Sequence, residues 1–154
     1  MKRVLVTGSG SGLGKAIAIE LGKQGFEVVL HHRNSVDGAM DAKKQIEDCG
    51  SKATLVQFDI TNREQTKEAL TKDIEDNGFY YGIIANAGLT SDAAFPMMTD
   101  EDWDGVVHTN LDGFYNVVKP CIMPMIGAHK GGRIIAISSV SGIMGNRGQV
   151  NYSA

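Results

Sequence analysis

A glycine-rich run near the N-terminus constrains the fold of this chain more than any other stretch. The run T-G-S-G-S-G-L-G occupies residues 7–14, between an apolar stretch at 4–6 and a helix-like stretch at 15–24. Its four glycines let the backbone turn sharply and approach a ligand closely. A strand that enters a helix through such a turn presents unpaired helix N–H groups and the positive end of the helix dipole, for which phosphate is the natural ligand.

The spacing of these glycines excludes two familiar phosphate-binding motifs. A P-loop requires glycine where this chain has Ser9, and Ser or Thr where it has Ala16. The G-x-G-x-x-G fingerprint requires its final glycine where this chain has Leu13 or Lys15. The pattern that remains is T-G-x-x-x-G-x-G. The alternative to a phosphate-binding turn is a strand–helix turn that binds no ligand.

Strand-like and helix-like stretches alternate along the chain. In the first helix Leu13, Ile17 and Leu21 recur at intervals of four, which predicts one packed helix face, and Gly25 ends the helix. Apolar runs predict strands at residues 4–7, 26–30, 53–58, 81–85 and 133–137. Helices are predicted at 36–49, 63–77 and, as two stretches, within 100–126. This alternation predicts an α/β fold with a doubly wound parallel sheet.

Three residues bear on the last helical region. Thr99 is predicted to be its N-cap. Pro120 and Pro124 are predicted to kink or end the second helical stretch, because proline lacks an N–H donor. No Pro- or Ser-rich linker divides the sequence, so residues 1–154 are expected to form a single domain.

Small or polar residues follow every predicted strand. In a doubly wound sheet, ligands bind outside the carboxyl ends of the strands. The sequence therefore predicts a site where five strand ends meet, formed by Thr7–Gly8, His31–Arg33, Asp59, Asn86–Gly88 and Ser138–Ser139.

Composition excludes several functional classes. The net charge of −3 and the absence of a Lys/Arg block argue against a nucleic-acid partner. No apolar run has the length of a membrane span or a signal peptide, so a cytoplasmic protein with no membrane partner is expected. Cys49 and Cys121 are expected to be free thiols, and the four histidines have no metal-binding spacing.

The T-G-x-x-x-G-x-G pattern, with N-A-G at residues 86–88, resembles the short-chain dehydrogenase/reductase family. The resemblance extends from Val4 to the last residue and implies a Rossmann fold that binds a nicotinamide dinucleotide. Asp59–Ile60 resembles the family's acid-plus-apolar pair that brackets adenine, although Asp59 could equally be the N-cap of the next helix. The residues implied to hold the cofactor are Thr7, Gly8, Ser11, Gly12, Leu13, Gly14, Arg33, Asp59, Ile60, Asn86, Ala87 and Gly88.

Arg33 indicates which dinucleotide is bound. NAD-binding folds place an acid about twenty residues after the glycine turn, whereas a nearby arginine accommodates the 2′-phosphate of NADP. The second strand is followed by H-H-R-N-S, with no acid before Asp37, so Arg33 can pair with that phosphate and NADPH is expected. Against this, Arg33 could simply be an exposed loop residue, and many NADPH-using relatives carry a basic residue where this chain has Ser11.

Ser139 and Tyr152 are the expected catalytic pair. Ketone reduction needs a proton donor for the carbonyl oxygen and hydrogen-bond donors for the developing negative charge. The two residues lie thirteen apart, as in the family, where the serine polarises the carbonyl and the tyrosine donates its phenolic proton. Asn110 matches the family asparagine that kinks its helix and supports a proton-relay water. Each residue also has an alternative interpretation. Ser139 could only cap a turn while Ser138 or Ser141 is the functional serine, and Asn110 could only interrupt its helix. Tyr152 could be a tyrosine of an interface or of the core.

The resemblance also implies a lysine at the fourth residue after Tyr152, and the sequence ends at Ala154. The C-terminal part of the family fold therefore lies outside this sequence, and we expect either a protein that continues beyond Ala154 or a fragment. A catalytically silent dinucleotide-binding subunit is the alternative from another functional class.

Within the family, the stretches at 88–92, 97–103 and 110–114 look most like 3-oxoacyl-acyl-carrier-protein reductases. This resemblance implies NADPH-dependent reduction of a 3-oxoacyl group bound to acyl carrier protein, in fatty acid or in polyketide or aryl polyene biosynthesis. It also implies a homotetramer, a dimer of dimers joined through helices at about 100–126. A reductase of a steroid, a sugar or another small ketone is the alternative among enzymes.

Overall fold

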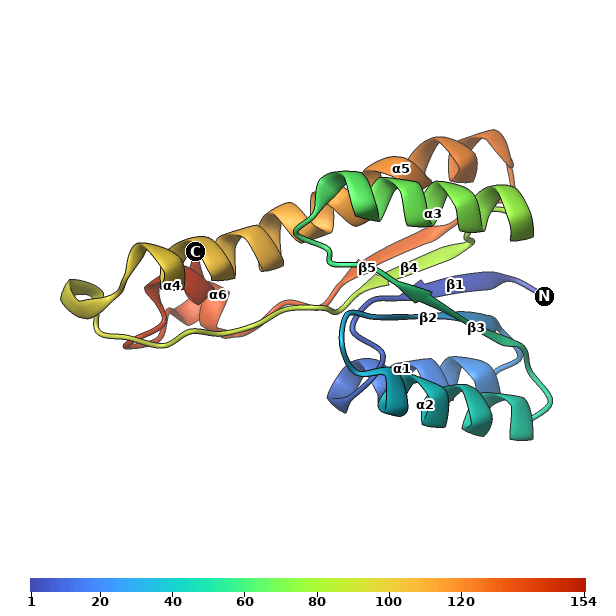
Figure 1. The fold of residues 1–154 in the computed structure, drawn as a ribbon, viewed down its shortest axis with the longest axis horizontal. Helices are drawn as coiled ribbons and strands as arrows, with labels where there is room; N and C mark the ends of the chain where they lie inside the picture. Colours follow the sequence, from blue (N-terminus) through green and yellow to red (C-terminus); the bar gives the residue numbers. More distant parts are fainter.

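The computed structural model describes residues 1–154 and contains one five-stranded parallel sheet with the strand order β3-β2-β1-β4-β5. Figure 1 shows the strands side by side, with helices on both faces. This arrangement confirms the predicted doubly wound α/β fold. The strands are β1 Arg3–Val6, β2 Glu27–His32, β3 Ala53–Gln57, β4 Gly82–Ala85 and β5 Arg133–Ala136.

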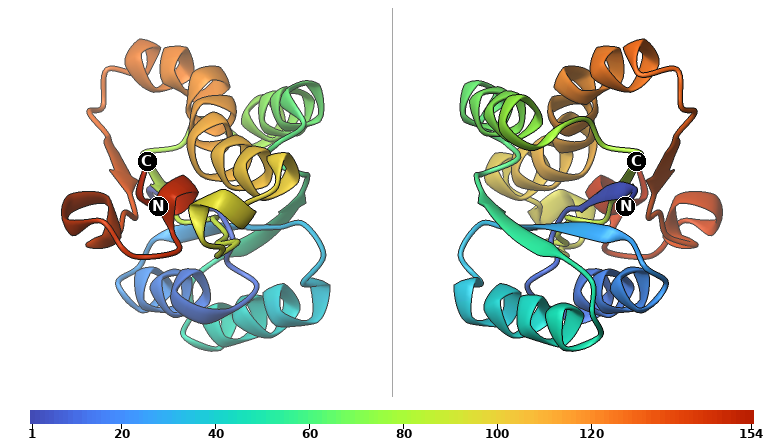
Figure 2. Two further views of the ribbon diagram at one scale, coloured as in Figure 1. Left: turned by 90° about the vertical axis from the view of Figure 1, so that its left-hand side faces the viewer. Right: turned by 90° about the vertical axis from the view of Figure 1, so that its right-hand side faces the viewer.

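Two helix layers enclose the sheet. Helices α1 and α2 cover one face, and α3 and α5 cover the other, as the end-on views of Figure 2 show. The long helices are α1 Gly12–Lys23, α2 Val36–Asp48, α3 Arg63–Asn77, α4 Asp100–Val107 and α5 Gly113–Gly127. Shorter helical elements are the 3-10 turn Phe95–Met97, the π-helical segment His108–Asp112, α6 Ser141–Met144 and α7 Val150–Ser153. The predicted elements are all present, with ends displaced by a few residues at most.

The central strands are buried on both faces. Val4 and Val6 of β1 pack into the cluster under α1 and α2, whereas Leu5 between them packs into the cluster under α3 and α5. Successive side chains of a strand point to opposite faces, so a strand between two helix layers must be apolar throughout. This requirement explains the uninterrupted apolar runs of the sequence.

The packed face of α1 matches the predicted one only in part. Its buried residues are Gly14, Ala18 and Gly22, whereas Leu13 is 58% exposed. A Cβ atom on Gly22 would lie 2.7 Å from Cγ2 of Ile46 in α2. The helices approach so closely that only small residues fit between them. Ile17 and Leu21 are partly buried and pack against the core, as predicted, whereas Leu13 does not belong to the packed face.

The two prolines, which were predicted to kink or end this helical stretch, do not end α5. The helix continues through Pro120 and Pro124 to Gly127, with Cys121 and Met125 buried against the sheet. Tertiary packing of this apolar face outweighs the hydrogen bonds that proline cannot form. The departure from α geometry lies upstream, in the π-helical segment at 108–112.

Thr99 is the N-cap of α4, as predicted. Its hydroxyl accepts a hydrogen bond from the Asp102 amide at 3.1 Å, and the Asp102 carboxylate accepts one from the Thr99 amide at 3.1 Å. This reciprocal capping box fixes the start of α4 just beyond the edge of the sheet.

Candidate functional site

The predicted site residues gather at the carboxyl edge of the sheet. They line two adjoining cavities of about 730 and 530 Å³, which share Leu13, Ile60 and residues 86–89 as walls. Tyr152, Ser139, Asn110 and Thr7 line the larger cavity. The smaller cavity is lined by further predicted residues, namely Gly8, Ser11, Gly12, Arg33 and Asp59. Among the predicted residues Gly14 alone lines neither cavity.

The glycine-rich turn joins β1 to α1 in a conformation that favours glycine. Gly8 and Gly12 have φ values of +66° and +52°. Ser11 is the N-cap of α1, but its side chain makes no capping hydrogen bond. The first amides of an α-helix have no acceptor within the helix. The turn therefore offers N–H groups and a positive helix end to an anion.

Gly14 shapes the turn from behind. A Cβ atom on Gly14 would lie 2.4 Å from both Nδ2 of Asn86 and the carbonyl oxygen of Gly8. The same Asn86 amide donates to the carbonyl oxygen of Thr7 at 3.0 Å. Gly14 is thus needed so that the Asn86 side chain can bind the turn.

Thr7 connects the ends of β1 and β4. Its buried hydroxyl accepts hydrogen bonds from the amides of Asn86 at 2.9 Å and Ala87 at 3.0 Å. Because these protein groups occupy the hydroxyl, Thr7 fixes the spacing between the glycine turn and the N-A-G segment.

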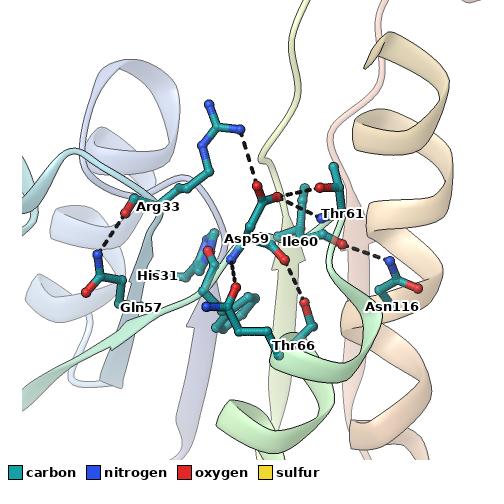
Figure 3. A network of polar contacts seen from close by, with 10 residues as sticks. His31, Arg33, Gln57, Asp59, Ile60, Thr61, Thr66 and Asn116 are labelled. Atoms are coloured by element: carbon teal, nitrogen blue, oxygen red, sulfur yellow. Dashed lines mark hydrogen bonds and ion pairs between the residues drawn. The ribbon is translucent and has the colours of Figure 1, made fainter. Parts of the chain in front are cut away.

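Arg33 and Asp59 both line the smaller cavity. Their side chains face each other (Figure 3), with 3.6 Å between Nη1 and Oδ2. The Asp59 carboxylate also accepts hydrogen bonds from the Thr61 amide at 2.9 Å and hydroxyl at 2.8 Å. Burial raises the pKa of Asp59, but the hydrogen bonds from Thr61 and the charge of Arg33 together lower it by more than burial raises it. The pKa of Asp59 is therefore below its usual range. Asp59 is not the N-cap of α3, because Asn62 occupies that position and accepts from the Gln65 amide.

Ile60 is held in place from α5. Its carbonyl oxygen accepts a hydrogen bond from Nδ2 of the buried Asn116 at 2.8 Å, as Figure 3 shows. A Cβ atom on Gly113 would lie 2.6 Å from Cδ1 of Ile60. Sequence reasoning assigned neither residue to this role, because Asn116 belongs to no motif, Gly113 was noted only within the 110–114 stretch, and only the fold brings them to this strand end.

His31 also belongs to the site, although the sequence marked it only as one of several polar strand ends. Its ring is 2% exposed and tilted against Phe58, with 4.1 Å between ring centroids. Nδ1 accepts a hydrogen bond from the Gly8 amide at 3.1 Å, and Nε2 donates to the Phe58 carbonyl oxygen at 2.9 Å. The imidazole therefore bridges the glycine turn and the end of β3.

Asn110 clamps the segment that follows β4. Its Oδ1 accepts from the Leu89 amide and its Nδ2 donates to the Leu89 carbonyl oxygen, both at 2.9 Å. Asn110 lies in the π-helical segment, where the wider turn is common at functional sites. These bonds use one lone pair of Oδ1 and one hydrogen of Nδ2, so each atom keeps the capacity for a second hydrogen bond.

Ser139 and Tyr152 line the same cavity from two different elements. The Ser139 hydroxyl accepts from the Ser141 amide at 3.2 Å, so it caps a turn as well as facing the cavity. Tyr152 lies on α7, where its amide donates to Oδ1 of the buried Asn151 at 2.8 Å. Nδ2 of Asn151 donates to the carbonyl oxygens of Ser91 and Asp102, both at 2.9 Å. Asn151, which sequence reasoning missed, thus ties α7 to Ser91 and to α4.

The structure contains no cluster of three or more His, Cys, Asp or Glu side chains that could hold a metal ion. None of its helices combines the length and apolar character needed to cross a membrane.

Comparisons with known proteins agree with this geometry. The family model described as short chain dehydrogenase matches residues 2–154. A 3-oxoacyl-(acyl-carrier-protein) reductase FabG of Aggregatibacter actinomycetemcomitans is 53% identical over 98% of this chain and 62% of its own length. The FabG reductases of Thermotoga maritima and Staphylococcus epidermidis are 35% and 32% identical over 99% of this chain. The chain spans about three fifths of the length of these relatives.

Proposed function

Because this chain belongs to the short-chain dehydrogenase family, we propose that the protein reduces a 3-oxoacyl group carried on acyl carrier protein, with NADPH as the reductant. The observation that carries the proposal is a shared wall. Leu13, Ile60 and residues 86–89 line both the cavity of the glycine turn and the cavity of Ser139 and Tyr152. A ligand extended along this wall would reach both ends of the site.

The residues present suit NADPH. The amides at the start of α1 would hold its pyrophosphate, Arg33 its 2′-phosphate, and Asp59 and Ile60 its adenine. When bound, the nicotinamide would supply the hydride that adds to the carbonyl carbon of the substrate. Asn86 and Thr7 would keep the two walls of the cofactor cleft at a fixed spacing.

The chemistry assigned to the chain's own residues completes the reduction. The Ser139 hydroxyl would donate a hydrogen bond to the substrate carbonyl and stabilise the negative charge that develops on its oxygen. The Tyr152 phenol would deliver the proton that converts this oxygen to a hydroxyl. Asn110 would hold the 88–90 segment, the wall against which the substrate lies, through its bonds to Leu89.

Exposed apolar side chains support the proposed homotetramer. Trp103 on α4 and Met123 and Ile126 on α5 are more than a third exposed and line neither cavity. Large exposed apolar side chains are what a subunit interface would cover.

The test is NADPH oxidation in the presence of acetoacetyl thioester. Turnover is expected in the wild-type protein, and Tyr152→Phe should lower it by about 10²–10⁴-fold while NADPH still binds, since general acid catalysis contributes that much. Tyr115→Phe removes the same hydroxyl from an exposed tyrosine outside both cavities and should change neither quantity. Substantial activity in Tyr152→Phe would overturn the proton-donor assignment. A protein that binds NADPH but never turns over would be a silent subunit.

A further inference from the structure

The proposed function leaves one buried titratable side chain at the site without a role. His31 lies at the end of β2 between two elements of the cofactor cleft, with the Gly8 amide on one side of its ring and the Phe58 carbonyl on the other. Phe58 directly precedes the Asp59–Ile60 pair proposed to hold adenine (Figure 3).

The two contacts fix the tautomer of this histidine. The Gly8 amide can only donate, so Nδ1 must carry a lone pair, and the Phe58 carbonyl can only accept, so Nε2 must carry the proton. Only the neutral ring satisfies both partners. A protonated ring would place two N–H groups against each other at Gly8.

The His31 backbone holds the next residue of the turn separately. Its carbonyl oxygen accepts from the Ser9 amide at 3.0 Å and from the Ser9 hydroxyl at 3.1 Å. Substitution of the side chain leaves these bonds in place, so the contribution of the imidazole can be measured by itself.

We infer that His31 is a positioning residue for dinucleotide binding: its neutral imidazole aligns the glycine turn with the adenine end of the cleft, and its protonation releases Gly8 and weakens binding. The inference rests on the proposed dinucleotide site. It assigns His31 no contact with the cofactor and no part in hydride or proton transfer.

The environment of the ring favours the neutral form. Burial and, less strongly, the neighbouring His32 lower the pKa of His31 to about 4, against the raising effects of the Phe58 carbonyl and the Asp59 carboxylate. Arg33, the other charged group at this end, is paired with Asp59. At neutral pH the ring therefore holds the turn.

A matched pair of variants tests the Gly8 contact. Asn places Oδ1 the same number of bonds from the backbone as Nδ1 of His, and Leu has a similar shape without an acceptor. Both substitutions lose the bond to Phe58, so they differ chiefly at the Gly8 amide. A buried amide without an acceptor is costly, and His31→Leu should bind NADP⁺ about tenfold more weakly than His31→Asn at pH 7. Equal affinities of the two variants would overturn the inference.

The pH profile and the imidazole itself give a second test. NADP⁺ is stable in acid, and its 2′-phosphate titrates equally in every variant. The affinity ratio of wild type to His31→Asn should therefore be constant near pH 7 and fall towards pH 4.

Imidazole ¹⁵N shifts in the wild-type protein should show an unprotonated Nδ1 and a protonated Nε2. The opposite tautomer, or a flat ratio, would refute the role even if His31→Leu fails to fold. Absence of NADP⁺ binding at pH 7 in the wild type would refute the proposed function instead.

Discussion

Arg33 is free to exchange partners when a cofactor binds. It is half exposed, and its only ion pair is the 3.6 Å contact with Asp59. Ion pairs at such exposure contribute about 0.2–1 kcal/mol, whereas hydrogen bonds to charged groups contribute about 1.5–3 kcal/mol. A 2′-phosphate would therefore compete well with the Asp59 carboxylate for the guanidinium.

Arg33→Ala should consequently weaken NADPH binding by roughly 10- to 100-fold, the equivalent of one or two charge-assisted hydrogen bonds. NADH lacks the phosphate, so its affinity should change little. Titration of both coenzymes measures the difference, with Arg147→Ala as a control at an exposed arginine that lines neither cavity. An equal loss for the two coenzymes would show that Arg33 acts through Asp59 and not through the phosphate.

Three polar residues of the site, of which sequence reasoning missed Asn116 and Asn151 and marked His31 only as a polar strand end, share one property. Asn116, Asn151 and His31 are buried polar side chains that bind backbone groups far away in the sequence. A motif records residues at fixed spacing along one segment, and these partners become neighbours only when β-strands and helices assemble. Buried polar groups need hydrogen-bond partners, but the sequence does not say which backbone groups provide them.

At the scale of elements, α2 packs directly against the glycine-rich turn. A Cβ atom on Gly38 of α2 would lie 1.8 Å from the carbonyl oxygen of Gly10, and one on Gly10 would lie 2.7 Å from Cβ of Ser35. The backbone of α2 lies directly against the backbone of the turn, so an added methyl group cannot be accommodated by rotation of a side chain. Gly38 therefore determines how closely α2 supports the turn.

Gly38→Ala should move α2 away from the turn and lower both thermal stability and NADPH affinity. Overpacking costs about 1–3 kcal/mol, which exceeds the gain of about 1 kcal/mol from replacing glycine within a helix. Thermal unfolding and coenzyme titration measure the two effects. Gly105→Ala in α4 is the matched control, because its Cβ would meet nothing within 4 Å, and it should keep or raise the melting temperature. A Gly38→Ala protein as stable as wild type would contradict the close contact.

The existence and order of the elements could be predicted from sequence, but their packed faces could not. Apolar runs and glycine turns place β1, α1 and β2 within a few residues, because local periodicity reports burial on a sheet or helix. In α1 the same rule found Ile17 and Leu21, which pack against the core, but it included the exposed Leu13 and missed Gly22, where α1 meets Ile46 most closely. The family resemblance anticipated that the helix is interrupted at Asn110, but not that the interruption is π-helical, because a single wider turn is too short to show its own period in the sequence.

The whole molecule is held by polar groups at both edges of the sheet. At the edge opposite the site, the buried Arg3 pairs with Asp73 at 2.8 Å and Glu27 at 3.1 Å, and it also binds the Gly78 carbonyl oxygen. The Tyr80 hydroxyl donates to Asp73 at 2.5 Å, and burial together with Asp73 raises the pKa of this phenol. These contacts join β1, β2 and α3, whereas the ring of His31 joins the strands at the site edge.

Acid should destabilise the molecule through His31 at a higher pH than through its carboxylates. The pKa of His31 falls from 6.5 to about 4 on folding, so between these values the unfolded chain binds a proton that the native state does not. The contribution of His31 to stability is complete above about pH 6.5 and is lost as the pH falls through 4. At 1.36 kcal/mol per pKa unit the full loss is about 3 kcal/mol. The pKa of Asp59 is lowered, so its contribution is lost only at more acidic pH.

Denaturant unfolding at a series of pH values measures this loss, because the midpoint follows the free energy of unfolding. His31→Asn has no titrating ring at this position and should flatten the slope between pH 6.5 and 4. His129→Asn makes the same change at an exposed histidine whose φ of +51° suits Asn, and its profile should keep the wild-type slope. Parallel profiles for wild type and His31→Asn would mean that the ring is hydrated in the native state and does not link the glycine turn to β3.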